Sequence, residues 1–236
     1  MLKKKITYYL LFFILSGSLF SQKERIENLP NFDKRKIHYG FYLGLNQNSF
    51  KFRYNNDSEA ITGEPNIEVM ADIGFNVGLI GDLKLHKNVN FRFEPGLISN
   101  TKTLKFHHIE DEIQSVRTAG NTYLHLPFIF KFSTDRLNNI RPYVLTGASF
   151  DHNFSSNAKN NDDNTVGEFR QNSNMFMYEV GIGIDIYLPY FKLSPSIRGI
   201  FAINNELKYD NNPGSQWTDP IDYMGTRGVF LHIAFE

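Results

Sequence analysis

Apolar and polar residues alternate along eight separate segments of this 236-residue sequence. A period of two is the signature of a β-strand with one apolar face. In the clearest segment, from 176 to 188, bulky apolar residues occupy every second position, with Glu179, Gly181, Gly183 and Asp185 between them. Most segments are about ten residues long, the length that a tilted strand needs to cross a bilayer. The eight begin near Ile37, Phe75, Val89, Leu124, Arg141, Phe176, Phe191 and Val229.

The connections between these segments alternate between long and short. Long polar loops are expected at residues 55–72, 107–118, 152–174 and 204–227, and short links at 86–88, 133–139 and 189–190. Long loops on one side, short turns on the other and an even strand count are typical of a bacterial outer-membrane barrel. The sequence therefore predicts an all-β protein, an eight-stranded antiparallel transmembrane β-barrel in the outer membrane. We expect the long loops outside the cell and the short turns in the periplasm.

The N-terminus has the three parts of a secretory signal peptide. Lys3, Lys4 and Lys5 form a positive region, residues 8–15 form an apolar run, and small residues follow up to Ser21. A membrane anchor is the alternative, but the apolar run is much shorter than the roughly 20 residues of a spanning helix. We therefore expect a signal peptide at residues 1–21, a short periplasmic tail at 22–36 and the barrel at 37–236.

Composition narrows the possible functions. The chain has 25 Lys and Arg, 25 Asp and Glu, and no Cys. The lack of Cys excludes disulfides, Cys-ligated zinc, iron–sulfur clusters and a bacterial lipoprotein anchor. Formal neutrality argues against a nucleic-acid partner, which requires a basic excess. We expect outer-membrane lipid around the barrel, and neither a cofactor nor a small-molecule substrate.

The polar face indicates which side of the sheet lies inside. Alternation alone fits both a lipid-facing apolar band and the apolar interior of a soluble lipocalin-like barrel. Glycines recur among charges on the polar face, where they leave room for long side chains in a narrow lumen, and the charges are of both signs, so they can pair. We predict a lumen charge network that fills the barrel and leaves no open pore, formed by Lys84, Arg92, Glu94, Lys131, Glu179, Asp185, Lys192 and Arg198, with Asp82 and Asp151 as further acids.

Three prolines lie inside predicted strands, at Pro95, Pro127 and Pro195. Each removes a ladder hydrogen bond, and a closed barrel has no edge strand where that loss is harmless. We therefore expect a bulge or a bend at each.

No arrangement of residues predicts catalysis or tight metal binding. His107 and His108 are adjacent and so point to opposite faces of a strand. Together with Asp111 and Ser115 they form the only candidate catalytic cluster, but it matches no motif. The acidic stretch 160–168 offers oxygen ligands without the spacing of an EF-hand, so at most weak Ca²⁺ binding is expected. We predict that the protein is not an enzyme.

Four sequence runs resemble the PorT family, called SprT in gliding bacteria. They are DKRKIHYGF at 33–41, FRFEPGL at 91–97, DRLNNIRPY at 135–143 and GIGIDIYLPYFKLSP at 181–195. The resemblance extends over nearly the whole mature chain, with the loops least similar, and the chain ends in Phe235 and Glu236 as members do. It implies an outer-membrane protein of Bacteroidota that is required for type IX secretion and, in gliding species, for motility. It supplies no catalytic residues.

One position departs from the family pattern. Members usually have an acid where this chain has His125. The local pairing of lumen charges must therefore differ here, and a histidine makes that pairing a candidate for pH sensitivity.

A packed eight-stranded lumen is too narrow for a folded passenger, so an assembly or accessory role is expected. Contact with other type IX components is expected on the periplasmic side, through Lys34, Arg35, Lys36, Asp135 and Arg136, or through the lipid-facing wall. A solubilising flank beside the membrane is the alternative explanation of the three basic residues. A structural or adhesive barrel with exposed loops is the alternative function.

Overall fold

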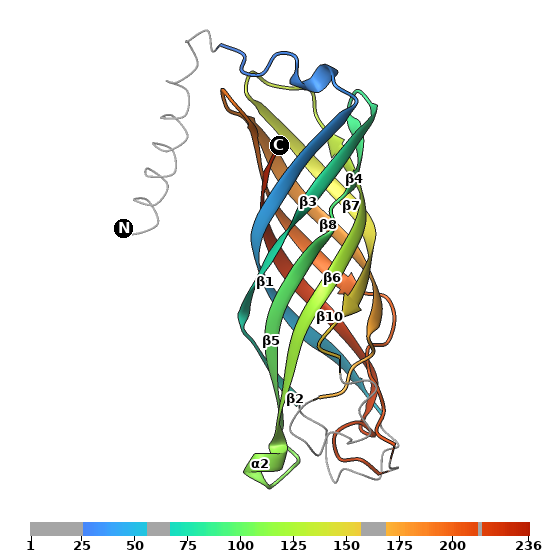
Figure 1. Ribbon diagram of the computed structural model, residues 1–236. Helices are drawn as coiled ribbons and strands as arrows, with labels where there is room; N and C mark the ends of the chain where they lie inside the picture. The colour runs from blue at the N-terminus through green and yellow to red at the C-terminus, as the bar shows by residue number, and fades with distance from the viewer. Residues whose placement is uncertain (1–25, 56–66, 157–168, 212–213) are drawn as a thin grey trace, which may run out of the picture.

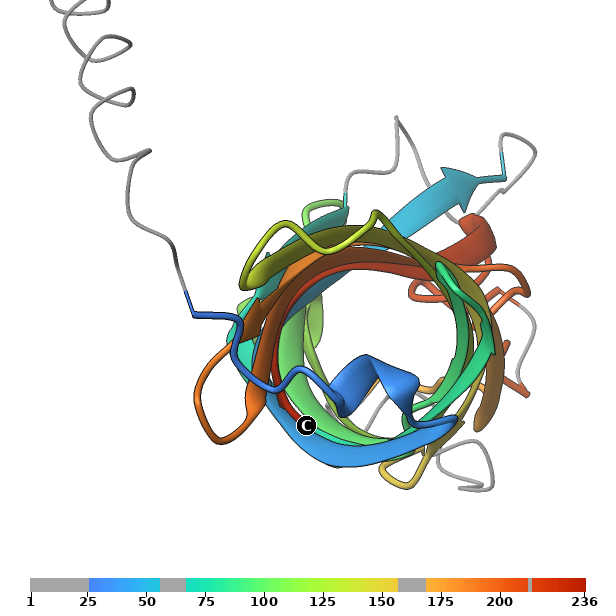
Figure 2. The ribbon, with the colours of Figure 1, turned by 90° about the horizontal axis from the view of Figure 1, so that it is seen from above.

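The computed structural model describes residues 26–55, 67–156, 169–211 and 214–236. In this part of the chain one antiparallel sheet closes into a barrel (Figures 1 and 2). Its strands are β1 (Ile37–Tyr54), β2 (Ile67–Ala71), β3 (Ile73–His86), β4 (Val89–Phe93), β5 (Gly96–Phe106), β6 (Val116–Ser133), β7 (Ile140–Asn153), β8 (Asn174–Tyr187), β9 (Lys192–Ala202) and β10 (Ile221–Phe235). Outside the sheet lie η2 (Phe32–Lys34) and α2 (Glu112–Ser115). No helix among these residues is long and apolar enough to cross a membrane.

These ten labelled strands form a ring of eight, because two pairs lie end to end. β4 and β5 keep one register against β3, with Phe93 opposite Gly81 and Gly96 opposite Gly78. β2 continues the line of β3, and both pair with β5. The ring closes because β1 pairs with both β10 and β3. The predicted eight-stranded antiparallel barrel is therefore confirmed.

A β-bulge separates β2 from β3. Ala71 pairs with Lys102, whereas Phe75 pairs with Ser99, so β3 contains one residue more than the register of β2 allows. Asp72 lies at the junction, and its amide donates to the Thr101 carbonyl at 3.1 Å. The bulge changes the inward-facing positions from the odd-numbered residues of β2 to the even-numbered residues of β3.

The three strand prolines form no bulges, so that part of the expectation is wrong. The registers of β4, β5, β6 and β9 against their neighbours continue through Pro95, Pro127 and Pro195 without a shift. The proline carbonyls still accept ladder bonds: Leu79 N donates to Pro95 O at 2.9 Å and Glu94 N to Pro127 O at 3.3 Å. Each proline therefore removes one donor without shifting the register, although the strand is interrupted at Pro95 and pairs are missing from the β8–β9 ladder beside Pro195.

The barrel exposes its apolar face and buries its charged face. Leu79 and Ile182 are 65% and 64% exposed, whereas Arg92 and Glu179 are fully buried. A soluble lipocalin-like barrel has the opposite arrangement, so this alternative is excluded. The short turns and the C-terminus lie at one end, at the top of Figure 1, which is the periplasmic end of an outer-membrane barrel.

The extracellular end of the lumen contains a large apolar cluster, which the sequence pattern did not indicate. β1 continues to Tyr54 and β10 starts at Ile221, so both strands extend well beyond the expected segments. Their inward side chains join residues from the loops in one buried cluster. It contains Phe50, Ile67, Leu104, Phe106, Ile109, Ala119, Phe169, Leu207, Ile221 and Met224.

Candidate functional site: the charged lumen and the periplasmic mouth

Arg92 on β4 is surrounded by three carboxylates in the periplasmic half of the lumen. Its Nε lies 3.3 Å from Asp82 Oδ2 and 3.1 Å from Glu94 Oε1, and its Nη2 lies 3.0 Å from Glu236 Oε1. All four side chains are buried. A planar guanidinium with several donors is suited to bind several acids at once.

Two lysines continue the network toward β8 and β9. Lys131 Nζ donates to both oxygens of Asp185, at 2.7 and 2.8 Å, and lies 4.0 Å above the Tyr143 ring. Lys192 Nζ lies 3.0 Å from Glu236 Oε2, so the side chain of the last residue bridges Lys192 and Arg92. Such shared pairing is what makes buried charges tolerable.

His125 lies between two acids deeper in the lumen. Its Nδ1 lies 2.7 Å from Asp151 Oδ1 and its Nε2 lies 3.0 Å from Glu179 Oε1. Nearby, Arg198 makes a two-pronged contact with Glu94, at 2.5 and 3.2 Å. His125 thus contacts an acid through each ring nitrogen and links Asp151 and Glu179 within the network.

Seven of the eight residues predicted for the network lie together in the lumen: Arg92, Glu94, Lys131, Glu179, Asp185, Lys192 and Arg198. Lys84 lies instead at the periplasmic mouth, where its Nζ donates to the Asp33 carbonyl at 2.6 Å. Glu236 was missed as a member. It continues the inward phase of Phe230, His232 and Ala234 on β10, and that phase was available in the sequence.

The periplasmic mouth is covered by the segment 26–36, called here the N-terminal cap. Figure 2 shows η2 lying across the opening of the barrel. The Asp33 carboxylate accepts hydrogen bonds from the Tyr187 hydroxyl at 2.8 and 3.1 Å and lies 3.5 Å from Arg141 Nη1. Phe32 stacks on His38, with ring centroids 4.4 Å apart. Side chains of the cap thus replace solvent at the mouth.

The turn between β6 and β7 holds the start of the cap. The Arg136 guanidinium lies 3.7 Å from the centroid of the Tyr187 ring and donates to the Asn28 carbonyl. Asn28 N donates to Asn139 Oδ1 at 2.9 Å, and Asn139 Nδ2 donates to the Ile26 carbonyl at 2.9 Å. These are long-range contacts, so the cap is tied to the barrel itself.

The residues predicted for periplasmic contact are in two different settings. Arg136 is used within the chain, and Asp135 accepts from Lys87 at 2.9 Å and from Asn88 at 3.1 Å. These hydrogen bonds hold the pKa of Asp135 below its ordinary value. The basic run Lys34, Arg35 and Lys36 is exposed on the outer side of the cap, with Lys34 Nζ bonded only locally, to Asn31.

The candidate catalytic cluster does not assemble. His107 Nε2 lies 3.2 Å from Glu68, and His108 Nε2 is bonded to the Gln216 carbonyl. Asp111 caps α2, and Ser115 Oγ donates to a backbone carbonyl. Among the described residues, no group of three or more His, Cys, Asp or Glu is placed to hold a metal. The acidic stretch 160–168 lies outside the described residues.

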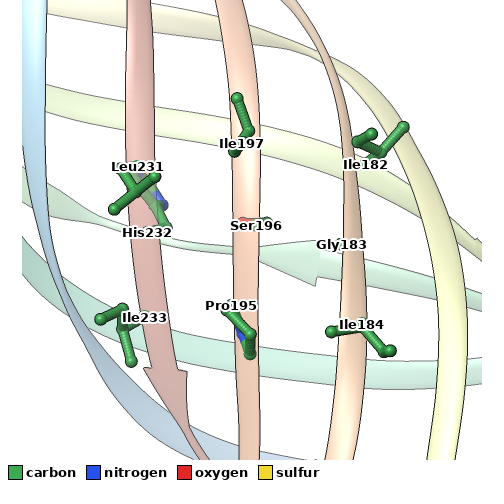
Figure 3. A pocket seen from close by; sticks show the side chains of 9 residues that line it. All are labelled: Ile182, Gly183, Ile184, Pro195, Ser196, Ile197, Leu231, His232 and Ile233. Atoms are coloured by element: carbon green, nitrogen blue, oxygen red, sulfur yellow. The ribbon is translucent and has the colours of Figure 1, made fainter. Parts of the chain in front are cut away.

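The lipid-facing wall has an apolar depression of about 380 Å³ where β8, β9 and β10 meet (Figure 3). Around it lie Ile182, Ile184, Pro195, Ile197, Leu231 and Ile233. The β8–β9 ladder lacks the pairs between Gly183–Ser196 and Ile186–Leu193, which is where Pro195 has no amide to donate. The depression therefore lies beside a gap in the β8–β9 pairing.

Several solved structures are similar to this chain. Among solved structures, OprG from Pseudomonas aeruginosa superposes with a TM-score of 0.50 and 12% identity, covering 84% of this chain and 92% of that one. Neisserial surface protein A gives 0.41 and 7%, covering 85% and 98%, and AlkL in lipid bilayers gives 0.43 and 12%, covering 83% and 88%. No protein with a curated description matches this sequence.

The sequence itself identifies the family. Residues 20–208 match the family described as "Outer membrane protein beta-barrel domain", which is well over half of the chain. The match includes β1 to β9, and therefore Arg92, Lys131 and Asp185 of the lumen network. The chain belongs to the outer membrane protein β-barrel domain family and resides in the outer membrane.

Proposed function

We propose that this barrel is a component required for type IX protein secretion, and for gliding motility where that occurs. In this proposal it acts as an assembly or accessory factor, and neither as the conduit nor as an enzyme. The resemblance to the PorT family supports the pathway, and the filled lumen supports the accessory role.

The runs that carry the resemblance coincide with the lumen and its mouth. Residues 91–97 contain Arg92 and Glu94, and 181–195 contain Asp185 and Lys192. The runs at 33–41 and 135–143 contribute Asp33 and Arg141, which lie 3.5 Å apart where the cap meets the barrel. The resemblance thus includes residues that contact one another in the packed interior, as expected for a family that shares this interior.

The observation that carries the accessory role is the closure of the barrel along its length. Charged side chains fill the periplasmic half of the lumen, a large apolar cluster packs around the buried Lys102 in the extracellular half, and the N-terminal cap covers the mouth. A barrel of eight strands has room only for its own side chains. A secreted protein must therefore cross elsewhere.

The periplasmic surface is the proposed place of contact with other secretion components. Lys34, Arg35 and Lys36 are exposed on the cap, which Asp33 and Phe32 fix to the barrel. A rigid basic patch outside a closed mouth suits an acidic partner surface. We also propose that residues 1–21 are removed as a signal peptide. The mature protein then begins at Gln22, and its intact mass is expected to correspond to residues 22–236.

The test is a clean deletion followed by quantification of type IX cargo in the medium and in the periplasm. Cargo trapped inside, with other outer-membrane barrels at normal abundance, supports the proposal, and unchanged secretion overturns it. Complementation with Lys34→Gln, Arg35→Gln and Lys36→Gln together tests the contact surface. Lys105→Gln, an exposed lysine at the other end of the barrel, is the matched control.

A structural or adhesive role would depend on the extracellular loops, which the accessory role does not require. Shortening the loop between Ser155 and Asn172 removes surface that an adhesin needs. If secretion is intact in this variant while attachment of cells to surfaces is lost, the adhesive function replaces the accessory one.

A further inference from the structure

The outer wall of the barrel changes from apolar to cationic along β1 and β10. On β1, the outward residues up to Leu45 are apolar, and Gln47, Ser49 and Lys51 follow them toward the extracellular end. On β10, Arg227 follows Val229 in the same direction and pairs with Ser49. This change marks the extracellular edge of the apolar band, where lipid headgroups lie.

A pocket of about 550 Å³ opens in the wall at this level, between β8, β9, β10 and β1. Tyr178, Phe201 and Tyr223 contribute aromatic rings to it, and Lys51 and Arg227 contribute cations. Gly225 forms part of its floor, because a Cβ atom there would lie 2.3 Å from the Tyr223 hydroxyl. The pocket therefore combines ring surfaces with positive charge on the lipid side of the barrel.

Two of the three cations at this pocket have no acidic partner among the described residues. Arg53 is occupied, since its Nε lies 2.5 Å from Asp222 Oδ2 and its guanidinium lies over the Tyr223 ring. Lys51 and Arg227 are exposed and make no ion pair within the described part of the chain. Two free cations beside one concave surface are suited to a doubly or singly charged phosphate.

An apolar groove leads from this pocket down the same wall. The next depression, of about 430 Å³, shares Arg227 and Phe201 with the pocket and adds Gly199 and Val229. Two residues further along the strands, Ile197 and Leu231 border the apolar depression of Figure 3. From the extracellular end toward the periplasm, the wall thus presents cations and aromatic rings at one level, then Gly199 opposite Val229, and then aliphatic side chains.

We propose that this wall binds a phosphate-bearing lipid of the outer leaflet. The phosphate lies between Lys51 and Arg227, the headgroup rests on Tyr178 and Phe201, and an acyl chain follows the groove past Val229. The polarity and direction of the groove match a lipid whose headgroup faces outward. The proposal is independent of any role in secretion.

The test uses the mature full-length protein in mild detergent. Monophosphoryl lipid A and the same lipid without its phosphate are titrated and followed by native mass spectrometry. The phosphorylated lipid is expected to bind about 10- to 100-fold more tightly, the range for one charge-assisted hydrogen bond. Equal affinity for the two lipids overturns the proposal without any variant being needed.

Substitutions then locate the site. Lys51→Gln with Arg227→Gln is expected to abolish the preference for the phosphorylated lipid. The matched control is Lys105→Gln, because Lys105 is also exposed and outward-facing but has Glu68 directly opposite on β2. Heat-modifiable migration on gels checks that each variant is folded. A preference retained by the double variant, or lost in the control, contradicts the assignment.

Competition with excess inorganic phosphate distinguishes a lipid phosphate from free phosphate as the ligand of this site. A lipid site is expected to keep its ligand, because the acyl groove contributes to affinity. Displacement of the lipid by inorganic phosphate at comparable concentration would overturn the lipid assignment in favour of free phosphate.

Discussion

Replacing Arg92 with Met tests whether the lumen network stabilises the barrel. The change leaves Asp82, Glu94 and Glu236 without the guanidinium that lies 3.0 to 3.3 Å from each of them. Breaking a buried ion pair by removing one partner costs about 3–5 kcal/mol, because the remaining charge is uncompensated. Glu94 and Glu236 keep Arg198 and Lys192, so the loss falls mainly on Asp82. We expect a decrease of about 3–5 kcal/mol in the free energy of unfolding.

The assay is urea unfolding in lipid vesicles, followed by far-UV circular dichroism and by heat-modifiable migration on gels. Because Asp82 bears most of the loss, Arg92→Met with Asp82→Asn is expected to regain about 1–3 kcal/mol, the cost of one unsatisfied buried group. Lys87→Gln is the control, since its pair with Asp135 is exposed and contributes little. A change for Arg92→Met no larger than that of the control refutes the reasoning.

Three further outcomes are expected. Asp33→Ala removes the acceptor for the Tyr187 hydroxyl and is expected to increase protease cleavage and amide exchange within residues 26–36. Lys34→Gln removes only a local bond to Asn31 and is expected to leave both rates unchanged. Reconstituted protein is expected to give little steady conductance in planar bilayers, and large stable channels would contradict a filled lumen. In an NMR titration the pKa of Asp135 is expected below the ordinary 3.8. The ion pair between Asp135 and Lys87 is therefore complete above pH 3.8 and is lost as the pH falls through the lowered pKa of Asp135. Lys87→Gln removes the main cause of the shift and is expected to raise the pKa of Asp135 toward its ordinary value.

The strand pattern was predictable because every second residue must face either lipid or a narrow lumen. Glu179 and Asp185 on β8 were assigned to the interior from this phase alone, and both are buried there. The bulges expected at Pro95 and Pro195 are absent. The local sequence shows that each proline lacks an amide, but it does not show the hydrogen bonds of the adjacent residues that keep the register.

Contacts between distant segments were beyond the sequence pattern. The cap depends on Asp33 meeting Tyr187, which is 154 residues away, and no periodicity encodes that distance. The bulge at Asp72 was missed for a related reason, since an extra residue in one strand is visible only against its partner. The apolar extracellular cluster was hidden because residues such as Phe169 and Leu207 lie in segments that composition marked as polar loops.

The charged lumen also gives the barrel its register. A slip of one residue in β9 would turn its inward side chains toward lipid and expose Lys192 and Arg198 on the outer wall. Each Arg or Lys facing lipid costs about 2–4 kcal/mol near the bilayer midplane and less near the interfaces, so these two would cost at most about 4–8 kcal/mol. An apolar lumen would carry no such penalty, because both faces of every strand would then tolerate lipid. The paired charges therefore act against misregistered barrels as well as filling the interior, whatever their net contribution to stability.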